Sequence, residues 1–94
     1  MTQNQNQKQN QYYVAVLMGS NVLFDASESI PIGLAATIVA VNSHAVGIVA
    51  TSSTRALALA QPAPIGPEIS GGGVTGYYWH YHNPMYRNCH IWYV

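Results

Sequence analysis

The stretch PIGLAATIVAVNSHAVGIVATSSTRALALA, residues 31–60, contains no proline after its first residue. Asp25, Ser27, Glu28 and Ser29 are cap-type and acidic residues just before it, and Pro31 suits the first turn of a helix. On a helix, steps of four and three would align one mostly apolar stripe: Leu34, Ile38, Val41, Ala45, Ile48, Ser52, Arg55 and Leu59. The pattern therefore predicts one long helix and a mainly α fold.

The opposite side of this helix would carry small side chains. At helical spacing it includes Gly33, Thr37, Ala40, His44, Gly47, Thr51 and Thr54. Small residues let a second backbone approach closely, so a helix that is apolar on one side and small on the other suits packing between two neighbours. The stretch predicts a stack or bundle.

A small all-β fold is the alternative. The segments TIVAV (37–41) and VGIVATSST (46–54) are rich in branched residues, and Gly47 disfavours a helix by about 1 kcal/mol relative to alanine. A membrane span is disfavoured, because Asn42, Ser43, His44 and Arg55 interrupt the apolar run.

The flanking segments differ from this stretch in composition. Residues 1–11 are rich in Gln and Asn and predict disorder. Residues 12–24 are apolar and β-rich around Gly19-Ser20-Asn21, which indicates two short strands or an extended arm. The expected organisation is a disordered segment (1–11), a helical assembly domain (12–60), a Pro/Gly linker (61–73) and an aromatic, histidine-rich tail (74–94).

The tail predicts a β-hairpin. Residues 77–82 and 90–94 are strong strand formers, and Asn83-Pro84 and Arg87-Asn88 are turn-type pairs. An isolated hairpin is only marginally stable in water, so this one should dock on another surface.

The same tail contains candidate metal ligands. His80 and His82 would share one face of a strand, whereas Cys89 and His90 would point to opposite faces, so only one of these two could readily join the pair. Nitrogen and sulfur ligands suit zinc or copper. The alternative is that these side chains are polar tips in an aromatic strand, with no cofactor bound.

The histidines also suggest two other roles. His44, His80, His82 and His90 could titrate between about pH 5 and 8 and make an assembly sensitive to acid. A general acid or base among the tail histidines, with Arg87 as an anion stabiliser, would indicate catalysis. We expect no enzyme, because the last acidic residue, Glu68, falls in the linker.

Charge and cysteine content limit the partners. Charged residues make up 6% of the chain and the net charge is +0, which disfavours nucleic acid binding and favours association with copies or paralogues of the chain. Cys89 is the single cysteine, so no internal disulfide can form. The polar N-terminus lacks the pattern of a secretory signal peptide.

A glycine run supports a different interpretation, a precursor of an exported, modified peptide such as a bacteriocin. Gly71, Gly72 and Gly73 would end a leader, with cleavage near Gly72 or Gly73, and the released tail would carry modifiable Tyr, Trp, His and Cys side chains. Secretion of the processed tail would follow. A flexible linker is the alternative role of these glycines.

The segment from Asn21 to Gln61, NVLFDASESIPIGLAATIVAVNSHAVGIVATSSTRALALAQ, resembles the Reb proteins of bacterial R-bodies, the killing-trait family. The likeness lies in an acid-plus-proline entry to a helix, small residues along it, and a step from His44 or Ala45 to Gly47. The resemblance implies a non-enzymatic subunit of a ribbon in a cytoplasmic inclusion, which extends on acidification.

Overall fold

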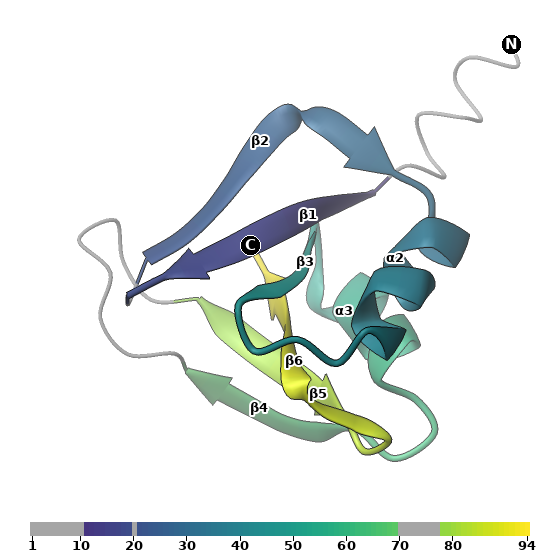
Figure 1. Ribbon diagram of the computed structural model, residues 1–94. Coiled ribbons are helices and arrows are strands. Elements are labelled where there is room, and N and C mark those ends of the chain that lie inside the picture. Colours follow the sequence, from purple (N-terminus) through teal and green to yellow (C-terminus); the bar gives the residue numbers. More distant parts are fainter. Residues whose placement is uncertain (1–10, 20, 70–77) are drawn as a thin grey trace, which may run out of the picture.

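The computed structural model describes residues 11–19, 21–69 and 78–94. They form a six-stranded mixed sheet in the order β2-β1-β3-β6-β5-β4, with two short helices on one face (Figure 1). The elements along the chain are β1 (Tyr12–Met18), β2 (Asn21–Ile30), α2 (Ile32–Ala40), β3 (Val46–Ala50), α3 (Ser53–Ala60), β4 (Ile65–Ile69), β5 (Trp79–Asn83) and β6 (Tyr86–Tyr93).

The prediction of a mainly α fold built on one long helix is wrong, and the small all-β alternative is closer. Helix α2 ends at Ala40, Asn42 takes a left-handed conformation with φ of 59°, and Val46–Ala50 is a strand. Asn is one of the few residues that adopt this conformation readily. The two packing faces expected on a single helix are therefore split among helix, loop and strand: Gly33, Leu34, Ile38 and Ala40 lie in α2, Val41 caps it, Ala45 lies in the following loop, and Gly47 and Ile48 lie in β3.

The cause of the error is the burial of β3. It is flanked by β1 and β6, and both of its faces are covered, with Ile48 packed on the helix side and Val49 on the other. A strand buried on both faces is a continuous apolar run, which periodicity alone does not distinguish from a buried helix.

Helix α3 begins at its own capping residue within the same stretch. The Ser52 hydroxyl accepts a hydrogen bond from the backbone N–H of Arg55 at 3.1 Å. This is the usual role of serine at a helix N-cap, where it satisfies an N–H that lacks a partner within the helix. Thr51 and Ser52 thus separate β3 from α3.

The two halves of the chain meet in the middle of the sheet. Strands β1 and β2 form an antiparallel hairpin, and β3 pairs antiparallel with β1. Strands β4, β5 and β6 form an antiparallel meander, and β6 pairs in parallel with β3. The hairpin expected in the tail is β5–β6, and it docks on β3. Its turn lies at Pro84 and Met85, whereas the predicted turn pair Arg87-Asn88 lies within β6.

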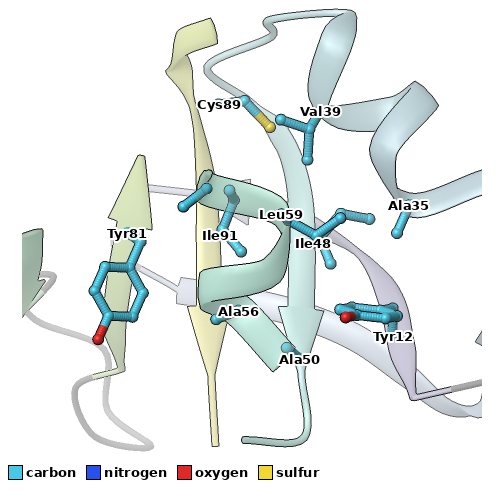
Figure 2. Close-up of a cluster of buried hydrophobic side chains, with 11 residues drawn as sticks. Tyr12, Ala35, Val39, Ile48, Ala50, Ala56, Leu59, Tyr81, Cys89 and Ile91 are labelled. Atoms are coloured by element: carbon cyan, nitrogen blue, oxygen red, sulfur yellow. The ribbon is translucent and has the colours of Figure 1, made fainter. Parts of the chain in front are cut away.

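The main core lies between the sheet and the helices (Figure 2). Ile48 and Ile91 extend from the central strands toward Ala35 and Val39 of α2 and toward the small apolar residues of α3. Cys89 is fully buried beside Val39. Alternate residues of β5 and β6 therefore face the helices, and the residues between them face the other side of the sheet.

Asn83 connects the end of α3 to the β5–β6 turn through side-chain hydrogen bonds. Its side-chain amide donates to the carbonyl oxygens of Leu59 and Gln61 at 2.9 and 3.0 Å, and its oxygen accepts from the N–H of Met85 at 2.9 Å. The last carbonyls of a helix lack partners within it, so one buried amide satisfies groups that would otherwise be unpaired.

In the part of the chain that the structure describes, no helix has both the length and the apolar character to cross a membrane.

Candidate metal centre

The sheet face opposite the helices holds a cluster of three histidines. His80 and His82 of β5 alternate with Tyr81, which faces the helices, and His90 of β6 alternates with Cys89 and Ile91, which do the same. Each of the three offers a nitrogen ligand atom, and these atoms lie within 4.8 Å of one another. Adjacent strands thus place three imidazoles on one patch.

His90 lies at the centre of all four imidazole rings in the chain. Its ring centroid is 5.0 Å from that of His80, 4.8 Å from that of His82 and 5.2 Å from that of His44. His44 comes from the loop between α2 and β3, so the residues predicted to sense pH are brought together by two separate parts of the chain. His44 lies at the margin of the three-histidine cluster.

Hydrogen bonding fixes the orientation of His82. Its Nδ1 lies 2.9 Å from the carbonyl oxygen of Cys89, which can only accept, so Nδ1 carries the proton. Its Nε2 then has a lone pair available for a metal. Metal-binding histidines usually donate their other ring N–H to a carbonyl or carboxylate in this way.

His90 presents a nitrogen of a different kind. Its Nδ1 is buried and has no hydrogen-bond partner among the described residues. A buried polar atom without a partner costs about 1–3 kcal/mol, so such atoms are rare in folded proteins and usually have a function. A metal bound to this nitrogen would remove the cost.

Glu68 of β4 lies beside the histidine cluster. Its Oε1 is 3.5 Å from Nε2 of His80 and 3.9 Å from Nε2 of His82, and its side chain is 61% exposed. Glu68 pairs in register with His80 across the β4–β5 ladder, which places the carboxylate on the same face.

The surroundings keep two of the imidazoles neutral. Burial, together with the neighbouring His82, His80 and His44, lowers the pKa of His90 from 6.5 to about 4. Burial and His82 also lower the pKa of His80, against the opposing effect of Glu68. A neutral imidazole is the form that binds metal, so the cluster is prepared for a cation at neutral pH.

An aromatic support lies next to the cluster. The Trp92 ring is fully buried and stacks on His90, with ring centroids 5.0 Å apart and an interplanar angle of 5°. Trp92 packs with Ala15, Val22 and Val49 in a second, smaller core on this face of the sheet. The stack holds the His90 ring in one orientation.

Of the four predicted metal ligands, the structure brings three together and separates the fourth. Cys89 points into the core beneath the helices, away from the histidines, and burial raises the pKa of its thiol to about 11. A thiol that keeps its proton is a poor metal ligand. Of Cys89 and His90, only His90 lies with His80 and His82.

Other predicted features lie elsewhere or outside the described residues. Arg87 is exposed and lies in β6 near the β5–β6 turn. Gly72 and Gly73, the expected cleavage positions, fall in the segment 70–77, which is outside the described residues.

Sequence reasoning missed Glu68. The composition of residues 61–73 predicts a linker, whereas Ile65–Ile69 is the edge strand β4 beside β5. The three prolines between 62 and 67 dominated the pattern and indicated an extended connection. The available signal was that an edge strand tolerates proline, because its outer backbone groups need no partner.

Comparison of the chain with protein-family models, with curated proteins and with solved structures finds no match. The resemblance to R-body proteins therefore stays a prediction.

Proposed function

We propose that this protein binds a transition-metal ion, Zn²⁺ or Cu²⁺, through His80, His82 and His90. The observation that carries the proposal is the convergence of three imidazole nitrogens within 4.8 Å from two paired strands. Three histidines are a sufficient protein ligand set for zinc, and imidazole is equally suited to copper.

Three further features support metal binding over a purely structural cluster. His82 is oriented by a carbonyl, His90 has a buried nitrogen without a partner among the described residues, and the lowered pKa values keep His80 and His90 neutral. A cluster with only a structural role would not be stabilised by bringing together basic side chains that repel one another when protonated.

The test is metal titration of the purified full chain at pH 7.5. Wild type should bind one Zn²⁺ per chain in competition with a chromogenic chelator. Replacing His80, His82 or His90 individually by alanine should weaken binding by about a hundredfold or more, since even groups outside the ligand set commonly contribute 10–100-fold. Quenching of tryptophan fluorescence by Cu²⁺ gives a second readout, because the Trp92 ring stacks on His90.

His44→Ala is the matched control, since it removes an imidazole next to the cluster and leaves the three ligands. It should bind zinc within a fewfold of wild type. The proposal is wrong if wild type binds no Zn²⁺ or Cu²⁺, or if the three single variants bind as tightly as wild type.

We infer that self-association is a second candidate function, supported by exposed apolar side chains on the helix-side face of β1 and β2. Val16 and Leu23 are opposite each other in the ladder and 38% and 52% exposed, and Val14 and Met18 are 38% and 59% exposed. With 6% charged residues, the chain has little charge to keep copies apart. The long helix no longer supports this function.

Sedimentation velocity across a wide concentration range tests self-association. Leu23→Lys should lower the mass of the particle, because a charge in the patch opposes burial, whereas Ser27→Lys on the same strand should leave it unchanged. A wild-type chain that stays monomeric at high concentration would contradict this candidate function.

A further inference from the structure

Glu68 is placed where a fourth ligand would be needed. Its Oε1 lies 3.5 and 3.9 Å from the Nε2 atoms of His80 and His82. In a tetrahedral zinc site with bonds near 2.1 Å, any two ligand atoms are about 3.4 Å apart, which is the edge of the tetrahedron. The carboxylate oxygen is thus already near the edge distance of such a site from each of the two imidazole nitrogens.

We propose that Glu68 is the fourth protein ligand and closes a His₃Glu site, an inference that rests on the proposed metal binding. Two of the four ligand positions come from β5, one from β6 and one from β4. Metal binding would require side-chain rotations that bring the three nitrogen ligand atoms, which lie within 4.8 Å of one another, to coordination distance.

The charges around Glu68 support this role. Within the described ranges Glu68 contacts His80 and His82, and no lysine or arginine there forms an ion pair with it. The other acidic residues, Asp25 and Glu28, lie on β2 at the opposite edge of the sheet. Glu68 therefore supplies the negative charge at this patch, and a divalent cation is the counterion that suits it.

The fourth ligand determines the chemistry of the site. Three imidazoles and one carboxylate oxygen suit Zn²⁺ or Cu²⁺, whereas Cu⁺ prefers soft sulfur ligands. With all four positions filled by the protein, no position is left for water or a substrate, which is the arrangement of structural zinc sites. The metal would join the edge strand β4 to β5 and β6.

The alternative is that Glu68 stays unbound and a water molecule occupies the fourth position, with the carboxylate beside it. Such a site would be open, as in catalytic zinc centres, and its bound water would ionise near pH 7. The two arrangements differ in the response of the bound metal to pH.

Co²⁺ substitution of the full chain distinguishes them, because the visible absorption of Co²⁺ reports its ligands. In wild type the Co²⁺ spectrum should be constant between pH 6.5 and 8.5. In Glu68→Ala and Glu68→Gln it should change near neutral pH, as a metal-bound water loses a proton, and affinity should fall at least about tenfold. Glu28→Gln, an exposed acid on β2, is the matched control and should behave as wild type.

Two outcomes would overturn the inference. If wild type binds Co²⁺ and Zn²⁺ but its spectrum already titrates near neutral pH, with unchanged affinity in Glu68→Ala, the fourth ligand is water and only the role of Glu68 fails. If wild type binds neither metal, the proposed function fails as well. Circular dichroism should show the same fold in all Glu68 variants, since this side chain is 61% exposed.

Discussion

Replacing Gly47 by alanine should destabilise the protein by about 3 kcal/mol, although alanine is the better strand former. A Cβ at this position would collide with the carbonyl oxygen of His90 and lie 2.9 Å from Cζ3 of Trp92. The carbonyl belongs to the backbone of the neighbouring strand and the Trp92 ring is fully buried, so neither can move aside without shifting β6. The midpoint of urea unfolding measures the effect.

Gly33→Ala is the matched control for this variant. Gly33 lies in α2, and no atom comes within 4 Å of a Cβ built there. Alanine is favoured over glycine in a helix by about 1 kcal/mol, so this variant should be slightly more stable than wild type. Equal stability of wild type and Gly47→Ala would contradict the contact between β3 and the Trp92 ring.

Acid should destabilise the metal-free protein by about 2 kcal/mol between pH 7.5 and 4.5 through His90 alone. The pKa of His90 is about 4 in the folded chain, and we take its ordinary value of 6.5 for the unfolded chain. Below pH 6.5 the unfolded chain binds a proton that the folded chain does not, so stability is complete above pH 6.5 and falls until about pH 4. The full difference of about 3.4 kcal/mol is reduced because the ring is partly exposed.

Several other groups face His90 and contribute to the acid response. His80, whose pKa is also lowered, adds to the loss, while Glu68 opposes it by favouring the protonated form of His80. His44 and His82 are close enough to repel a protonated His90. Urea unfolding in the presence of EDTA at pH 7.5, 6, 5 and 4.5 gives the profile.

His90→Phe should flatten much of this profile, since a phenyl ring can stack on Trp92 and cannot titrate. His82→Gln is a comparison variant that keeps His90 in place. A wild-type profile that is flat from pH 7.5 to 4.5 would show that the His90 ring is well solvated, contrary to its buried Nδ1.

Local parts of the fold could be predicted from the sequence, whereas the fold class could not. The β1–β2 hairpin and the aromatic hairpin of residues 79–93 follow from turn residues and alternation, which are local signals. The strand Val46–Ala50 was assigned to a helix because its burial on both faces depends on β6, a segment distant in sequence. Asn42 takes the left-handed conformation that ends α2. The sequence alone does not show this conformation, because apolar residues continue on both sides of Asn42.

The candidate site was partly predictable for the same reason. Strand alternation alone places His80 and His82 together, and it separates Cys89 from His90. To predict that His90 joins them, one must know that β5 pairs with β6. To predict that Glu68 lies beside them, one must know that a proline-rich segment forms an edge strand. Contacts between strands are thus the information that spacing along the chain did not contain.

The parallel pairing of β3 with β6 has a consequence for biosynthesis. Ile48 pairs with Ile91, so a strand that is made well after β3 fills the centre of the sheet. Until the ribosome has released residues 86–93, β3 presents an unpaired edge and an apolar surface to its surroundings. Such nascent edges pair readily with other chains, and distant pairings form slowly. The interval before β6 docks is therefore when this chain is most exposed to aggregation.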